Sequence, residues 1–144
     1  MSRRFLVDLN VILDVLLDRN PHAEASSALW AAVESGEAEG LLAAHCVTTL
    51  HYLAARAKGR EFGDRCVAET LSVFSVAPID AAVLGAALQL GWTDFEDAVC
   101  AAAAEASGCQ FIATRDSHGF TRASCPALTP QAALLAIRSP LTRD

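Results

Sequence analysis

Several features are missing from this sequence, and each absence removes a class of protein. The 144 residues contain no uncharged apolar stretch of about 20 residues, the length that a helix needs to cross a bilayer. Charged residues make up 19% and hydrophobic residues 53%, a balance that excludes a disordered chain. No signal peptide is visible, because Asp8 interrupts the apolar run that follows the basic start. We therefore expect a cytoplasmic protein without a membrane partner, folded as one domain over residues 1–144.

The sequence also lacks CxxC pairs. Its five cysteines are scattered and odd in number. Cys46, Cys100 and Cys109 stand in apolar surroundings, so we interpret them as buried small side chains rather than metal ligands. A zinc site would need tighter spacing in the sequence. Unpaired thiols fit the reducing cytoplasm.

Positive charge is scarce as well. The formal net charge is −6 and the pI is about 5.1. This balance argues against a surface built for broad electrostatic adhesion to nucleic acid or to an anionic membrane. It still allows an enzyme that acts on nucleic acid, provided that bound metal ions and a few local arginines supply the positive field.

Short apolar runs alternate with helical patterns of 10 to 15 residues along most of the chain. This alternation predicts an α/β fold, a three-layer α/β/α sandwich around a parallel sheet of four to five strands. The strands are unbroken apolar runs, as burial on both faces requires. The expected strands are 5–7, 40–44, 73–76, 110–114 and a short fifth strand at 127–128. The expected helices are 10–17, 22–34, one from Thr48 or Thr49 to 57, 61–71, 81–90, 95–106 and one from Pro130 to 137.

Four aspartates stand where expected strands give way to a loop or helix. Asp8 ends the first strand, Asp94 and Asp97 open the helix 95–106, and Asp116 follows the strand 110–114. If the strands are parallel, these carboxylates gather along the edge of the sheet where ligands bind in such folds. Crowded carboxylates oppose each other's ionisation, so the cluster predicts a cation site.

Simpler interpretations exist for some of these residues. Asn10 is placed to cap the first helix, and either Thr93 with Glu96 or Asp94 with Asp97 can form a capping box. Positions 94 and 97 nevertheless share one helix face, while Glu96 points elsewhere and is expected to be solvated or salt-bridged. Asp8 lies among apolar neighbours, where a carboxylate is usually paired or bound to metal.

The residues before Asp116 are polar too. Thr114 is expected to hold a metal-bound water or to orient Asp116. Arg115 is interpreted either as a phosphate contact or as a structural ion-pair partner. The oxygen-rich set suits Mg²⁺ or Mn²⁺, and metal ions of this kind activate water in phosphodiester hydrolysis.

The segments 5–14, 94–98 and 114–116, followed by Phe120, resemble the PIN domain family, and particularly its VapC-type toxins. The resemblance covers nearly the whole chain. It implies a Mg²⁺- or Mn²⁺-dependent ribonuclease that cuts RNA, is inhibited by an antitoxin and forms a homodimer. It also implies that Asp8, Asp97 and Asp116 are the metal ligands, that Asp94 supports catalysis, and that Asn10 and Thr114 lie near the site.

One departure from the family pattern affects the expected activity. PIN domains usually carry a glutamate in the helix after the second strand, but residues 46–56 contain no acid. His51 or Thr49 stands near the position where this glutamate is expected, and Asp14 is a candidate to replace the missing carboxylate. A second hypothesis is therefore a PIN-like binding or regulatory module with weakened catalysis. A third is a phosphatase with Asp8 as nucleophile, which Asn10 disfavours because such enzymes carry a second aspartate there.

Overall fold

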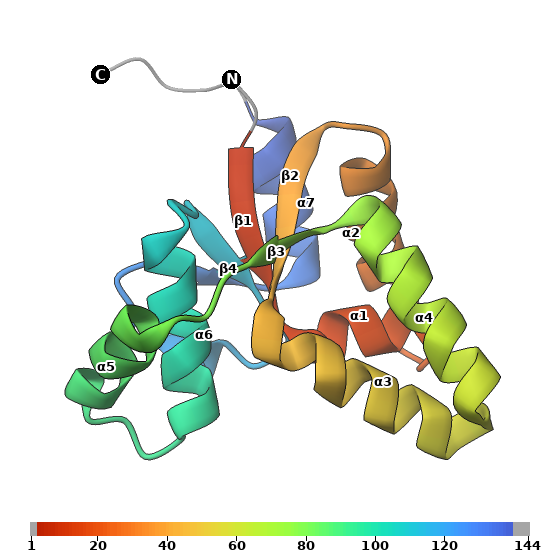
Figure 1. Ribbon diagram of the computed structural model, residues 1–144. Coiled ribbons are helices and arrows are strands. Elements are labelled where there is room, and N and C mark those ends of the chain that lie inside the picture. The colour runs from red at the N-terminus through yellow and green to blue at the C-terminus, as the bar shows by residue number, and fades with distance from the viewer. Residues whose placement is uncertain (1–2, 140–144) are drawn as a thin grey trace.

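The computed structural model describes residues 3–139, and within them five parallel strands form one sheet (Figure 1). The strand order is β3-β2-β1-β4-β5, so the first strand lies at the centre. The strands are β1 (Arg3–Val7), β2 (Ala38–Ala43), β3 (Ser75–Ala77), β4 (Phe111–Ala113) and β5 (Ala127–Leu128). The predicted parallel sheet is confirmed, with five strands.

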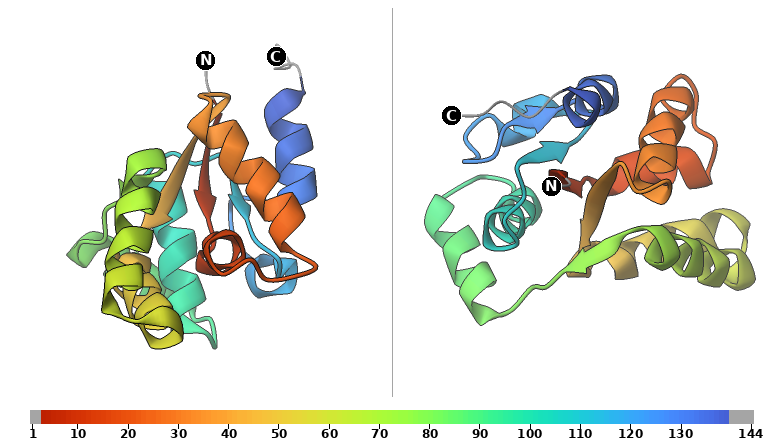
Figure 2. Two further views of the ribbon diagram at one scale, coloured as in Figure 1. Left: turned by 90° about the vertical axis from the view of Figure 1, so that its right-hand side faces the viewer. Right: turned by 90° about the horizontal axis from the view of Figure 1, so that it is seen from above.

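Two helical layers enclose the sheet. Helices α2 and α7 lie on one side of it, and α5 and α6 lie on the other (Figure 2). The consecutive helices α3 and α4 pack together and extend away from the sheet (Figure 1). This arrangement is the predicted α/β/α sandwich. The helices are α1 (Leu9–Leu16), α2 (Ala23–Glu34), α3 (Ala44–Lys58), α4 (Arg60–Val73), α5 (Ala81–Leu90), α6 (Phe95–Ala106) and α7 (Pro130–Arg138).

The core forms where the apolar strands meet the most buried helix. In the central strand, Phe5, Leu6 and Val7 are buried, and the Phe5 ring stacks on Phe111 of β4 with 5.0 Å between centroids. Helix α6 has seven consecutive buried residues at 98–104, five of them alanine. Small side chains let this helix lie close to the strands, so its first turn reaches the carboxyl ends of β1 and β4.

Two sequence-based predictions about helix starts were wrong. Helix α3 follows β2 directly and begins at Ala44, four residues before Thr48. The Thr48 hydroxyl donates to the His45 carbonyl inside the helix, so it does not cap the start. Helix α1 begins at Leu9 with Asp8 in the cap position, which places Asn10 within the first turn.

A 3₁₀ turn, η1 (Ser117–Phe120), follows β4 and was not expected from the sequence. It brings Gly119 back toward the first turn of α6, which matters for the site below. Among the described helices, none is both long and apolar enough to cross a membrane.

Candidate active site

Two of the predicted residues are joined directly at the carboxyl end of the sheet. The Asp8 backbone N–H donates to the Ala113 carbonyl at 2.8 Å, which aligns the ends of β1 and β4. The Thr114 hydroxyl, which is fully buried, donates to Asp8 Oδ2 at 2.8 Å. The same hydroxyl accepts the Asp116 N–H at 3.0 Å. Thr114 therefore fixes the Asp8 carboxylate and the start of the Asp116 loop together.

The carboxylates of Asp97 and Asp116 converge at Gly119. A Cβ atom on Gly119 would stand 2.9 Å from Asp97 Oδ2 and 3.7 Å from Asp116 Oδ2. A side chain at position 119 would therefore press on Asp97. Asp94 serves as the N-cap of α6, because its Oδ1 accepts the Asp97 N–H at 3.1 Å. The cap holds Asp97 in the first turn of the helix.

The electrostatics of the site reflect this crowding. Burial, followed by the negative charges of Asp94, Glu96 and Asp8, raises the pKa of Asp97 to about 7. Burial also raises the pKa of Asp8, although the Thr114 hydrogen bond opposes the rise. A cation among these groups would relieve the repulsion and favour their ionised forms. The donor atoms are carboxylate oxygens, which suit a hard divalent cation.

A hollow of about 250 Å³ opens beside Asp97. It offers a place for part of a substrate next to the carboxylates. Its walls combine an aromatic ring, polar side chains and one arginine, and they are Trp92, Thr93, Asp94, Asp97, His118, Gly119, Thr121 and Arg122.

Asp14 is completely buried beneath this edge and lies between two arginines. Its Oδ1 accepts a hydrogen bond from Arg19 Nε at 2.9 Å, and its Oδ2 lies 2.7 Å from Arg115 Nε. Both carboxylate oxygens therefore face guanidinium groups, and Asp14 does not take the place of the missing glutamate. Arg115 is an ion-pair partner, one of the two roles that the sequence left open. Arg19 also donates to the Asn10 carbonyl oxygen at 3.2 Å.

Helix α3 does not bring its candidate substitutes to the carboxylates. His51 Nε2 lies 2.7 Å from Asp64 on α4, and Thr49 is exposed. Instead, the start of α3 meets Glu96, whose Oε1 lies 3.2 Å from His45 Nε2. This contact lowers the pKa of Glu96 to about 2. Glu96 is therefore salt-bridged, one of the two outcomes expected for it.

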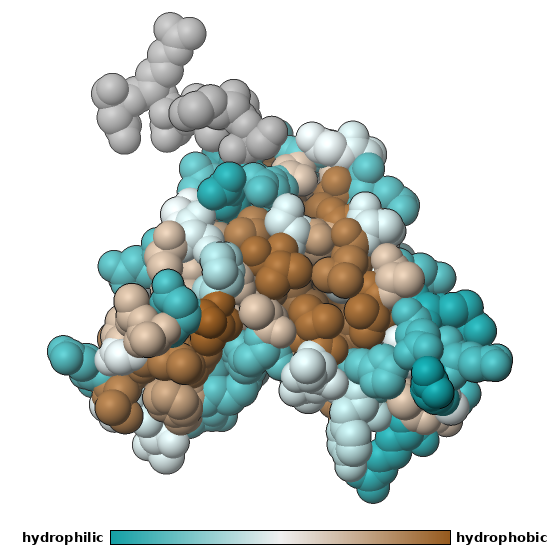
Figure 3. Space-filling model, in the orientation of Figure 1, coloured by the Kyte–Doolittle hydropathy of each residue, from teal (hydrophilic) through white to brown (hydrophobic). Residues whose placement is uncertain are grey.

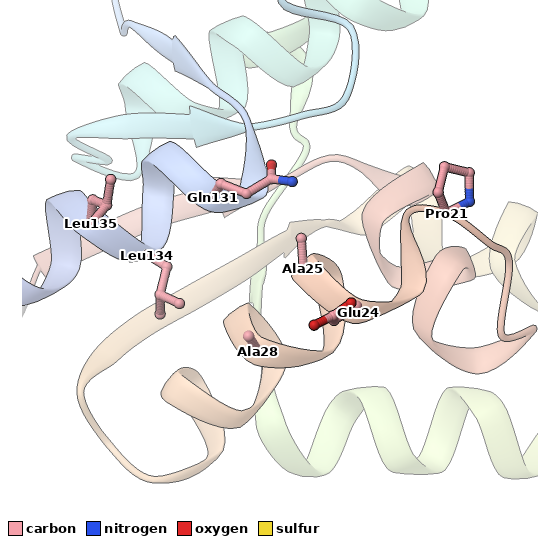
Figure 4. A pocket seen from close by; sticks show the side chains of 7 residues that line it. All are labelled: Pro21, Glu24, Ala25, Ala28, Gln131, Leu134 and Leu135. Atoms are coloured by element: carbon pink, nitrogen blue, oxygen red, sulfur yellow. The ribbon is translucent and has the colours of Figure 1, made fainter.

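A separate groove lies between α2 and α7 and has a volume of about 490 Å³ (Figure 4). Its floor is apolar, formed by Ala25, Ala28 and Leu134, and Figure 4 shows Glu24 and Gln131 at its sides. None of the four aspartates of the predicted site lines it.

The sequence matches the model of the PIN domain family over residues 4–118. Because this match spans most of the chain, the protein belongs to the PIN domain family. The match includes Asp8, Asp97 and Asp116 and confirms the resemblance seen in the sequence. No curated protein sequence matches the chain significantly.

Solved structures share the fold at low sequence identity. VapC20 of Mycobacterium tuberculosis, a toxin described as cleaving the sarcin–ricin loop, has a TM-score of 0.68 and 18% identity over 82% of this chain and 94% of that one. FitAcB of Neisseria gonorrhoeae has a TM-score of 0.66 and 24% identity over 88% and 97%. VapBC2 of Rickettsia felis, bound to promoter DNA, has a TM-score of 0.68 and 14% identity over 88% and 98%.

Proposed function

We propose that this protein is a metal-dependent endoribonuclease and the toxin of a toxin–antitoxin pair. The observation that carries the proposal is the convergence of Asp97 and Asp116 at Gly119, beside the Asp8–Thr114 hydrogen bond, in a PIN domain. Three carboxylates at one edge of a parallel sheet form the oxygen-rich site that phosphodiester hydrolysis with divalent metal requires.

In this proposal each residue has a defined task. Asp8, Asp97 and Asp116 hold Mg²⁺ or Mn²⁺, which when bound lowers the pKa of water and neutralises charge on the phosphate. Thr114 keeps the Asp8 carboxylate in place, and Asp94 keeps Asp97 in place through the helix cap.

Asn10 and Arg115 have supporting tasks. Asn10 lies in the first turn of α1, and its side-chain oxygen accepts a hydrogen bond from Arg19 at 3.3 Å, so its task is to hold this end of the helix beside Asp8. The Arg115 side chain is 29% exposed while it pairs with Asp14, so one side of its guanidinium remains available to an RNA phosphate.

The partners follow from the relatives. Several similar structures are complexes, among them FitAB bound to DNA and a toxin–antitoxin complex from Klebsiella pneumoniae. These complexes support an antitoxin partner for this chain. The toxin VapC20 is described as cleaving a ribosomal loop, which supports RNA as the substrate class. A cytoplasmic location agrees with such a substrate.

We further propose a homodimer. Figure 3 shows apolar surface gathered on the face that carries β3 and over α5. Exposed apolar side chains on α4, β3 and α5 include Leu71, Val76, Leu84 and Leu88. Strand β3 is an edge strand of the sheet, so its outer side is open to a second copy. Sedimentation at micromolar concentration should give twice the chain mass of 15.2 kDa, and a monomer mass throughout would contradict this proposal.

The test is RNA cleavage with and without Mn²⁺ by the wild type, Asp97→Asn and Asp116→Asn. Loss of a ligand that contributes several kcal/mol should slow cleavage by roughly 100-fold or more. Asp18→Asn is the matched control, because this exposed aspartate lies away from the cluster and an asparagine tolerates its positive φ of 49°. Equal cleavage by the wild type and Asp97→Asn would refute the mechanism.

The second candidate function is a PIN-like binding module with weakened catalysis. The observation that favours it is the acid-free segment 46–56. The two candidate substitutes do not fill the gap, because His51 pairs with Asp64 and Asp14 pairs with Arg115. Calorimetry with Mn²⁺ separates the two functions. Binding that disappears in Asp97→Asn supports the nuclease, whereas no heat of binding at millimolar metal supports the binding module.

A further inference from the structure

Four side chains that the carboxylate site does not use meet where α3 approaches α6. They are His45, Cys46, Glu96 and Cys100, called the thiol–imidazole cluster below. One potential ligand atom from each of them lies within 4.8 Å of all the others. Two come from the first turn of α3 and two from successive turns of α6. The cluster therefore combines nitrogen, sulfur and oxygen donors from two helices.

The distances in the thiol–imidazole cluster match the edges of a tetrahedron around one small cation. The two Sγ atoms lie 4.0 Å apart, and His45 Nε2 lies 3.6 Å and 3.7 Å from the sulfurs of Cys46 and Cys100. Glu96 Oε1 lies 3.5 Å and 3.4 Å from these sulfurs and 3.2 Å from Nε2. Tetrahedral zinc with ordinary bond lengths gives edges of about 3.8 Å for S–S, about 3.5 Å for S–N and S–O, and about 3.3 Å for N–O. All six observed edges agree with these values to within a few tenths of an ångström.

The same distances disfavour two other uses of these residues. In a catalytic triad, the histidine uses one ring nitrogen for the nucleophile and the other for the carboxylate. Here Cys46, Cys100 and Glu96 all face the same nitrogen, Nε2 of His45. The Sγ–Sγ distance of 4.0 Å is also far from the roughly 2.05 Å of a disulfide bond.

The surroundings suit a cation that prefers sulfur. Cys46 and Cys100 are each 2% exposed, which shields their sulfurs from water. The side chains of His45 and Glu96 are 29% and 51% exposed, so an ion can reach the cluster from their side. Thiolate ligands select zinc over Mg²⁺ and Mn²⁺. The cluster therefore differs in chemistry from the carboxylate site, although the Glu96 carboxylate also lies within 4.8 Å of those of Asp94 and Asp97.

We propose that the thiol–imidazole cluster is a structural Zn²⁺ site that ties the start of α3 to the first turns of α6. The ion would hold Glu96 and Cys100, and thereby the helix turn that carries Asp97. It would stand beside the segment in which the acid expected from the family is missing. The proposal depends only on the four ligands and holds whether or not the protein cleaves RNA.

The test is Zn²⁺ binding by the full chain, purified under reducing conditions and stripped with a chelator. A titration against a chromophoric chelator should give one tight site, and Co²⁺ should give the ultraviolet band of cobalt–thiolate bonds. Cys100→Ser should weaken binding by more than roughly 100-fold, because even partners outside the ligand shell contribute 10–100-fold. Cys66→Ser is the matched control, because this buried cysteine on α4 lies outside the cluster. Excess Mg²⁺ should not displace the bound ion.

Two further variants keep the result interpretable. Glu96→Gln changes a half-exposed ligand and is expected to fold, so weaker Zn²⁺ binding by this variant supports the site even if Cys100→Ser is unstable. Asp97→Asn should lose Mn²⁺-dependent cleavage but keep Zn²⁺ binding, which separates this inference from the proposed function. Equal Zn²⁺ affinity in the wild type, Cys100→Ser and Glu96→Gln would overturn the proposal, as would Co²⁺ binding without the thiolate band.

Discussion

Replacing Asp14 by asparagine removes the buried negative charge that pairs with both Arg19 and Arg115. Asp14 is 0% exposed, whereas the side chains of Arg19 and Arg115 are 37% and 29% exposed. Breaking a buried ion pair costs about 3–5 kcal/mol. The charges left behind here belong to arginines that remain partly hydrated, so we expect a loss near the lower end, about 3 kcal/mol. For a chain of this length, that loss should lower the melting temperature by about 10 °C.

Urea unfolding of Asp14→Asn, Arg115→Met and the double variant measures the interaction directly. Groups in contact usually show a coupling energy of about 0.5–3 kcal/mol. We expect a value in the upper part of this range, because the Arg115 Nε–Asp14 Oδ2 distance is 2.7 Å and the carboxylate is fully buried. A loss below about 1 kcal/mol in Asp14→Asn, or fully additive costs in the double variant, would refute the reasoning.

The same ion pair should affect activity through the chain that follows β4. Arg115 lies between Thr114 and Asp116, so its pairing with Asp14 anchors the loop that carries a proposed metal ligand. Arg19→Met removes the other arginine, on the α1 side. Both arginine variants should lose stability, but Arg115→Met should lose more RNA cleavage when the two are compared well below their melting temperatures. Equal losses of cleavage in the two variants would show that the Arg115–Asp14 ion pair does not affect activity through the loop that carries Asp116.

Two other substitutions test the geometry of the site. Gly119→Ala places a Cβ atom 2.9 Å from Asp97 Oδ2. We therefore expect weaker Mn²⁺ binding by calorimetry, with a loss of folding stability below about 1 kcal/mol. Unchanged Mn²⁺ affinity would show that the Asp97 carboxylate moves aside freely. Thr114→Val removes the hydroxyl between Asp8 and Asp116 and should cost about 1–3 kcal/mol in urea unfolding. Thr114→Ser should restore most of that loss, and a valine variant as stable as the wild type would exclude the linking role.

The positions of the aspartates were predictable because they depend on local sequence and on one topological rule. Asp8 and Asp116 each follow an apolar strand, and parallel pairing of β1 with β4 brings those strand ends together. The capping role of Asp94 was predictable for the same local reason. Sequence periodicity was also sufficient for the α/β/α layers, since helical segments separate the first four strands along the chain.

Contacts between distant segments could not be predicted. The start of α3 was placed too late because Thr48 looks like a helix cap, whereas the chain enters the helix straight from β2. The pairing of Arg115 with Asp14 joins residues that are far apart in the sequence. The spacing of Glu96 and Cys100, one helical turn apart, was a visible signal for half of the thiol–imidazole cluster. Its other half, His45 and Cys46, is about 50 residues away and meets α6 only in the folded protein.

The first turn of α6 links the two proposed cation sites, because the Glu96 carboxylate lies within 4.8 Å of those of Asp94 and Asp97 as well as near the thiols. Successive residues of a helix point about 100° apart, so the side chains of Glu96 and Asp97 also reach different partners. Asp97 faces Gly119 and the oxygen ligands of the sheet edge, while Glu96 faces the sulfur and nitrogen atoms of His45, Cys46 and Cys100. A hard cation is favoured on one side and a thiolate-binding cation on the other. Because Asp94 caps this same turn, movement of α6 relative to α3 would change both sites together.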